Sequence, residues 1–94
     1  MNDLKHVIVT TSYRGVFYGQ ISKDDLLNTT ITLHNANNVL YWSHETKGFL
    51  GLSSLGPNDD CKIGALAGGP VILHGITSIT QCSNEAIQAW KKYQ

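Results

Sequence analysis

The stretch HVIVTTSYRGVFYGQI, residues 6–21, decides the fold because it holds two strand-like segments around a short turn. His6–Thr11 is short and rich in β-branched residues, and Gly15–Ile21 alternates side chains between two faces that are both partly apolar. Gly19 stands inside the second segment, where a glycine indicates curvature or the close approach of another backbone. The stretch therefore predicts a curved antiparallel hairpin, as in a small barrel.

The chain that follows continues the β pattern. TTITLHNA, residues 29–36, alternates apolar and polar residues. The overlapping NANN, residues 35–38, tolerates left-handed backbone, so it predicts a turn after which VLYWS, residues 39–43, returns as a separate strand. A glycine-rich excursion comes next, and it contains one short predicted strand at Cys61–Ile63. VILHGITSIT, residues 71–80, predicts two half-strands bent at a central glycine.

A helix closes the chain. Ser83 is a good N-cap for the segment NEAIQAWKKYQ, Glu85 falls in the positive first turn, and two lysines fall in the negative last turn. We expect this helix over about 84–93, packed on the strands through Ile87 and Trp90. The fold class predicted is mainly β, a single domain over 1–94 that forms a small SH3-like or Sm-like β-barrel with a C-terminal α-helix. Such barrels often assemble into rings, so we expect a homo-oligomer.

Composition excludes several classes of protein. The chain has 41% hydrophobic and 15% charged residues, which is typical of a globular domain and not of disorder. Seven Lys plus Arg balance seven Asp plus Glu, so no global positive field attracts nucleic acid or an anionic membrane, and a nucleic-acid partner is not expected. No apolar run reaches the length of a secretory or membrane-spanning segment. We expect a cytoplasmic protein without membrane contact, whose Cys61 and Cys82 stay free.

The stretch YWSHETKGFLGLSSLGP, residues 41–57, is the candidate functional region, and three interpretations stay open. Its aromatic residues can be packing for the core and a hairpin. Alternatively, because strand neighbours point to opposite faces, either Tyr41 or Trp42 faces outward and stacks a flat ring while nearby cations hold a phosphate. In the third interpretation, the exposed apolar residues of GFLGLSSLG form a subunit contact.

Polar groups around this stretch extend the candidate site. Arg14 occupies a turn where its guanidinium could reach an anion. GLSSLGP offers consecutive backbone N–H groups and two hydroxyls that could cradle a phosphate, although it lacks the lysine of a nucleotide-hydrolysing loop. The predicted ligand-binding residues are Arg14, Tyr18, Tyr41, Trp42, His44, Lys47, Phe49, Ser53 and Ser54.

Enzyme chemistry finds little support in the sequence. The segment HET is not the zinc-binding His-Glu-x-x-His motif, and the four histidines have no metal-ligand spacing. Cys61 and His74 could in principle pair as nucleophile and base, but DCKIG resembles no nucleophile signature. We therefore predict no catalytic residues, no metal ligands and no cofactor.

Read in order, RGVFYG, NVLYWS, GFLGL, GP and CKIG resemble the motif series of a family of proteins of similar length. That family is encoded by phages and prophages and is known only as a domain of unknown function. The resemblance runs from Val7 to Trp90 and implies a phage setting. The resemblance implies no mechanism, but some small phage proteins sequester nucleotide signals of host immunity. Together with an outward aromatic ring, Arg14, Lys47 and the glycine-serine loop, this class favours a non-catalytic anti-defence sponge for a nucleotide-like molecule. The alternatives are a structural or interaction protein, either a virion accessory or an inhibitor of a host protein, and an Sm-like nucleic-acid binder.

Overall fold

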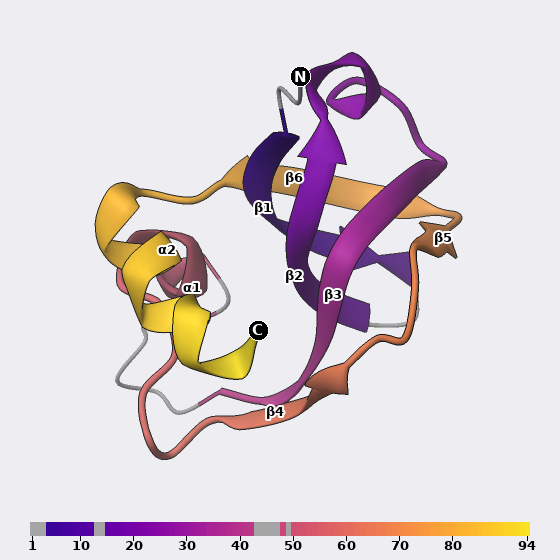
Figure 1. Cartoon of the computed structure of the whole chain (residues 1–94). Coiled ribbons are helices and arrows are strands. Elements are labelled where there is room, and N and C mark those ends of the chain that lie inside the picture. The colour runs from indigo at the N-terminus through magenta and orange to yellow at the C-terminus, as the bar shows by residue number, and fades with distance from the viewer. Residues whose placement is uncertain (1–3, 13–14, 43–47, 49) are drawn as a thin grey trace.

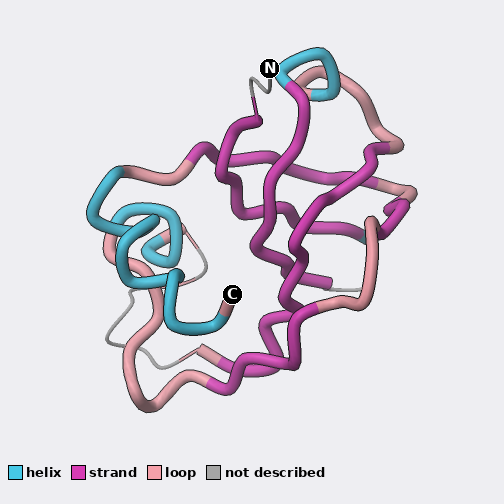
Figure 2. Tube along the Cα trace, in the orientation of Figure 1, coloured by secondary structure: helices cyan, strands magenta, loops and turns pink. Residues whose placement is uncertain are grey.

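The structure is a computed structural model that describes residues 4–12, 15–42, 48 and 50–94. Its strands are β1 (Leu4–Thr11), β2 (Gly15–Ser22), β3 (Ile31–Tyr41), β4 (Lys62–Leu66), β5 (Val71–Leu73) and β6 (Ile76–Gln81). Two short α-helices, α1 (Gly51–Ser54) and α2 (Asn84–Trp90), lie on one side of the strands (Figures 1 and 2). Single 3-10 turns occupy η2 (Lys23–Asp25) and η4 (Lys91–Tyr93).

The predicted hairpin forms the centre of the sheet. β1 pairs antiparallel with β2 along its whole length, from Leu4 opposite Ser22 to Thr11 opposite Gly15. The strand order is β4-β3-β2-β1-β6, and β5 pairs with β3. β6 is the last strand in the sequence, and it pairs with β1, the first strand. β1 therefore lies between its hairpin partner β2 and the strand nearest the C-terminus.

The predicted turn over residues 35–38 is wrong, because residues 31–41 form one continuous strand. The chain does not turn back at these residues, and an irregularity within β3 takes the place of the predicted turn. Its pairing with β2 shifts by one residue, since Tyr18 lies opposite Asn37 while Gln20 lies opposite His34. Asn35 adopts the left-handed conformation at φ 52°, which asparagine tolerates better than most residues. The left-handed backbone was therefore anticipated, but it makes a bulge and not a reversal.

Gly19, the β2 residue opposite this bulge, is required by a close approach. A Cβ atom at position 19 would lie 2.5 Å from Cγ of Leu33 on β3. The missing side chain lets β3 fold closely over β2, and this is the curvature that the sequence predicted.

β5 and β6 are two halves of a bent segment, as predicted, and the bend lies at Gly75 with φ +69°. The Gly75 carbonyl accepts a hydrogen bond from the N–H of Ser12 at 3.0 Å, and the next N–H, of Ile76, donates to the Thr29 carbonyl at 3.0 Å. β5 pairs with β3 while β6 pairs with β1, so the two halves of the bent segment extend different parts of the strand arrangement. The sheet is mainly antiparallel β with a C-terminal helix, but it is not closed, and the predicted barrel is not confirmed.

Both faces of the curved sheet carry a core, because each central strand alternates apolar side chains between two sides. One core lies within the curve of the strands and contains Val7, Val9, Ile21, Ile31, Leu33 and Ala36. The other lies between the strands and the helices and contains Ile8, Val16, Tyr18, Val39, Leu52, Cys61, Ala86 and Trp90.

The C-terminal helix begins where the sequence predicts. The Ser83 side chain accepts a hydrogen bond from the Ala86 N–H at 3.1 Å, which satisfies one of the free donors of the first turn. The α-helix ends at Trp90, and residues 91–93 continue as the 3-10 turn η4. Cys61 and Cys82 are free, as expected.

Candidate ligand-binding site

Two neighbouring rows of residues cross β2, β1 and β6 on the helix-facing side of the sheet. In the first, Tyr18 lies opposite Ile8, and Ile8 lies opposite Thr80. In the second, Val16 lies opposite Thr10, and Thr10 lies opposite Ser78. We call these the closed row and the open row. Side chains two residues apart on a strand share a face, so the rows lie side by side but meet different surroundings.

The closed row lies against α2. The Trp90 ring stacks on the Tyr18 ring with 4.3 Å between centroids and 2° between planes, and both side chains are almost fully buried. The indole Nε1 donates to the Leu52 carbonyl at 3.1 Å, and the Tyr18 hydroxyl lies 2.7 Å from Nδ1 of His6. These bonds satisfy the polar atoms of large buried rings, so this end of the face is packed and sealed.

The groups beside the closed row are chemically quiet. Burial raises the pKa of the Cys82 thiol to about 12 and also raises the pKa of Tyr18, because a low-dielectric environment disfavours the charged form. Cys82 therefore stays protonated near neutral pH and is a poor nucleophile.

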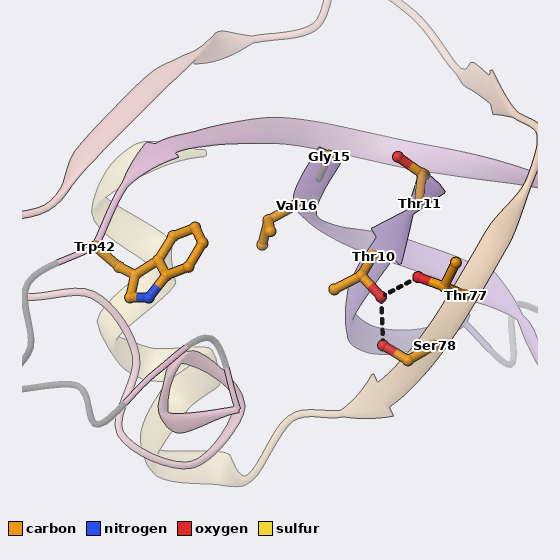
Figure 3. Close-up of a pocket in the computed structure, with 7 residues that line it drawn as sticks. All are labelled: Thr10, Thr11, Gly15, Val16, Trp42, Thr77 and Ser78. Atoms are coloured by element: carbon orange, nitrogen blue, oxygen red, sulfur yellow. Dashed lines mark hydrogen bonds between the residues drawn. The ribbon is translucent and has the colours of Figure 1, made fainter. Parts of the chain in front are cut away.

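The open row forms the wall of a cavity of about 390 Å³, a size within the range of small-ligand sites. Figure 3 shows its lining residues, with the Trp42 ring on one side and the hydroxyl groups of β1 and β6 on the other. The described lining residues are Thr10, Thr11, Gly15, Val16, Trp42, Thr77 and Ser78, all of which are uncharged. This part of the lining suits a neutral group, because uncharged side chains do not compensate a buried charge.

The hydroxyl groups of Thr10, Thr77 and Ser78, which we call the hydroxyl wall, are brought together by a β-bulge. The β1–β6 register shifts between Thr10 and Thr11, which pair with Ser78 and Ile76 and leave Thr77 as the extra residue. Oγ1 of Thr10 lies 2.7 Å from Oγ1 of Thr77 and 2.5 Å from Oγ of Ser78. In a regular strand, residues 77 and 78 would point to opposite faces, so the bulge brings a second hydroxyl to Thr10.

The sequence left open which of Tyr41 and Trp42 faces outward, and the structure places the two rings in different surroundings. Tyr41 is 51% exposed at the end of β3, whereas Trp42 is partly buried, packs against the helix-side core and lines the cavity. The aromatic residue placed at a cavity is therefore Trp42. Tyr41 offers a solvent-facing ring next to it in sequence.

The other predicted residues fall into three groups. Tyr18 is buried under Trp90, and Ser53 is buried with its Oγ donating to the Leu50 carbonyl at 2.6 Å, so neither presents its polar group to the cavity. Ser54 is exposed, and its Oγ lies 3.4 Å from the Gly51 carbonyl. The predicted residues Arg14, His44, Lys47 and Phe49 lie outside the described residues. The segment GLSS, read as a phosphate loop, forms α1 instead.

Sequence reasoning missed the hydroxyl wall. Thr10 and Ser78 lie in segments that were read only as strands, and nothing local marks their pairing across 68 residues. The available signal was the composition of β6, ITSITQ, in which three of the six residues carry a hydroxyl group. That composition does not indicate which hydroxyl groups meet, nor that they line a cavity.

Two smaller cavities lie elsewhere in the described part of the chain. A second cavity, of about 260 Å³, lies near His34, Asn35 and Pro70, and a third, of about 190 Å³, lies between Leu27 and β6. Within the described residues, His, Cys, Asp and Glu side chains form no group of three or more that could hold a metal ion. No described helix is long and apolar enough to cross a membrane.

Comparison with known proteins places the chain in a family. Neither the curated proteins nor the solved structures include a match to it. One family model, described as "Domain of unknown function (DUF6948)", matches residues 4–90. This match covers every described strand and both α-helices. The chain therefore belongs to the DUF6948 family of domains of unknown function.

Proposed function

We propose that this protein is a non-catalytic binding protein whose cavity takes the planar ring of a small, nucleotide-like molecule. The observation that carries the proposal is the cavity of about 390 Å³ between Trp42 and the hydroxyls of the open row. Trp42 supplies a flat apolar surface for stacking, and the hydroxyls supply hydrogen bonds that fix orientation. A charged tail on such a ligand would lie away from the described lining residues, because these are uncharged.

The absence of a reactive set among the described lining residues favours binding over catalysis. The lining holds threonine, serine, valine, glycine and tryptophan, with neither a base nor an acid to activate a hydroxyl. The cavity therefore supports recognition of a ligand, which is what a sequestering protein needs.

The biological setting that we propose is a phage or prophage protein of the host cytosol that sequesters a nucleotide-like signal of host defence. The motif resemblance that runs from RGVFYG to CKIG supports this setting. The cavity supports the ligand class, since a nucleobase is a neutral planar ring with polar edges.

Self-association is part of the proposal, and the edge of β6 supports it. Cys82 donates its N–H to the His6 carbonyl, so residues 78, 80 and 82 direct their backbone groups toward β1 while Ile79 and Gln81 direct theirs outward. β6 is the end strand of the described order, and ITSITQ has neither a charge nor a proline to block pairing. A second β6 could pair there antiparallel.

A second candidate function, docking on a host or virion protein, is favoured by exposed leucines. Leu50 and Leu55 flank α1 with 55% and 47% of their surfaces exposed, and Leu40 is 62% exposed. Large apolar side chains in water are typical of protein contacts when they form one patch. A partner protein captured in a way that Leu50→Ser and Leu55→Ser abolish would favour this function.

Native mass spectrometry of the gently purified protein tests the leading proposal. We expect an oligomer that carries an added mass of nucleotide size. Trp42→Ala should lose that mass and Trp42→Phe should keep part of it. Tyr41→Ala is the matched control, because it removes the neighbouring aromatic ring that faces solvent. A bare protein that also fails to bind nucleosides by calorimetry would overturn the proposal.

The oligomer is tested separately by sedimentation velocity. Gln81→Pro removes an N–H that points away from β1, so it should abolish pairing at the β6 edge while leaving the β1 ladder intact. Gln81→Ala is the matched control, because it changes the same side chain and keeps the N–H. A protein that sediments as a monomer before any substitution contradicts self-association and leaves the cavity proposal standing.

A further inference from the structure

We propose that the hydroxyl wall selects a ring that presents a hydrogen-bond donor beside an acceptor, and that it accepts the two in either order. This inference rests on the proposed function, because it specifies the ligand of the same cavity. It follows from counting the protons that Thr10, Thr77 and Ser78 hold and the bonds that they make with one another.

The proton count leaves one spare donor. Each hydroxyl has one proton and two acceptor lone pairs, so the cluster has three protons, and its two internal bonds use two of them. The remaining proton must point to solvent or ligand. Several lone pairs also stay open. Thr11 adds no donor, because its Oγ1 already donates to the Ser12 carbonyl at 3.0 Å.

The position of the spare proton can reverse. Thr10 lies in the middle of the cluster and contacts both other hydroxyls, and either partner in each contact can donate. If Thr77 donates to Thr10 and Thr10 donates to Ser78, the free proton is on Ser78 and the open acceptor is on Thr77. If both bonds reverse, the free proton moves to Thr77. In the third arrangement both outer hydroxyls donate to Thr10, and the spare proton is that of Thr10. In the first two arrangements the wall offers a ligand one donor and one acceptor, and either of the two outer hydroxyls can be the donor.

Burial makes this arrangement effective at the cavity. Thr10 is 9% exposed and anchors the cluster, whereas Thr77 is exposed and Ser78 is partly exposed, so the two ends of the cluster are the accessible ones. Cooperative polarisation strengthens a chain of hydroxyls when its end donates to a ligand acceptor. On the opposite side, Trp42 and Val16 give the ring a flat apolar surface (Figure 3).

Three nucleosides with the same ring size test whether the wall needs a donor beside an acceptor, and whether it accepts the two in either order. Uridine presents N3–H beside a carbonyl, and cytidine presents an amino group beside an unprotonated ring nitrogen, so both carry an adjacent donor and acceptor in opposite order. 3-Methyluridine keeps the carbonyls but has lost the N–H. A wall of reversible polarity should bind the first two alike and reject the third, because a hydroxyl lone pair and a methyl group cannot replace the lost hydrogen bond.

Titration calorimetry with uridine, cytidine and 3-methyluridine provides the measurement on the unaltered protein. We expect the dissociation constants of uridine and cytidine to agree within about threefold, and that of 3-methyluridine to be about tenfold higher, the usual effect of one lost hydrogen bond. Equal binding of all three would overturn this inference while leaving the proposed ring site intact. Binding of none of them would count against the proposed function itself.

Variants test whether the hydroxyls cause the preference. Thr77→Val with Ser78→Ala leaves Thr10 alone, so the ratio between 3-methyluridine and uridine should fall from about tenfold to less than about threefold. Thr80→Val is the matched control, since it makes the same chemical change two residues along β6 in the closed row. Circular dichroism confirms that each variant is folded. A preference that survives the double substitution would place its origin elsewhere in the cavity.

Discussion

The closed row and the open row differ by one step along the same three strands, yet one is sealed core and the other lines a cavity. In the closed row, the Trp90 ring stacks on Tyr18 with 4.3 Å between centroids, and Ile8 is buried in the same cluster. In the open row, the equivalent β1 and β2 positions are Thr10 and Val16, and β6 contributes Ser78. The three strands are shared, so the difference comes from the helix that covers one row and from the register shift in the β1–β6 pair beside the other.

The comparison teaches that α2 determines where the core ends. The helix is seven residues long, and its buried tryptophan covers the closed row. The next row along the strands is bordered by Trp42, which comes from the end of β3 and is only partly buried. A row that is not covered by a helix can keep hydroxyl groups hydrated or bound to a ligand, which a sealed row cannot do without a cost.

The largest effect that separates the rows is expected from removing the two tryptophans one at a time. Trp90→Ala should lower the free energy of unfolding by about 3–5 kcal/mol, because it empties a fully buried site and removes the Tyr18 stack. Trp42→Ala should cost less than about 2 kcal/mol, since its ring is only partly buried. Urea unfolding followed by circular dichroism measures both values. Equal costs would contradict the division into a sealed and an open row.

A smaller effect is expected when the polar attachment of the closed row is removed. Tyr18→Phe keeps the stack on Trp90 but removes the hydroxyl that lies 2.7 Å from Nδ1 of His6. The free energy of unfolding should fall by about 1 kcal/mol, the usual net contribution of such a bond. Urea unfolding also measures this change. If the stability is unaltered, the hydrogen bond to His6 contributes nothing and packing alone seals the row.

The smallest effect is a pH dependence at the edge of the closed row. Burial lowers the pKa of His6 from 6.5, and the positive charge of Lys91 lowers it further. The unfolded chain therefore binds this proton more readily than the folded one. The stabilisation is present above pH 6.5 and is lost as the pH falls from 6.5 through the lower pKa of the folded state.

Thermal melts at pH values from 7.5 to 5 measure this dependence, and His6→Gln is the control. The difference in melting temperature between the two proteins should change with pH only over that acidic interval. Parallel curves would show that His6 contributes no pH dependence.

Local patterns predicted most elements of the fold. β-Branched residues located β1 and alternation located β2, while Gly75 located the bend before β6 and Ser83 the start of α2, because each of these signals acts within a few residues. Two features escaped prediction. The left-handed Asn35 makes a bulge because β3 pairs on both sides of it, and the sheet stays unclosed because β5 and β6 choose different partners. Both depend on contacts between distant strands.

The site was harder to predict than the fold. Trp42 was recognised as a candidate, because an aromatic pair on a strand must place one ring on each face. The hydroxyl wall depends on a one-residue shift in the register between β1 and β6, and register between distant strands cannot be read from either strand alone. Tyr18 was included in the predicted site, but its ring stacks on Trp90, and a contact between residues so far apart in the sequence cannot be read from either of them.

The contact between Thr10 and Ser78 joins residues 68 apart, and this has a consequence for folding kinetics. The cavity wall cannot exist until the last strand has docked on the first, which is a slow, non-local step in β proteins. A cavity ligand would therefore bind only the completed native state and shift the unfolding equilibrium by mass action. In a refolding experiment, ligand binding would appear only in the final phase, so the cavity reports when the chain has finished folding.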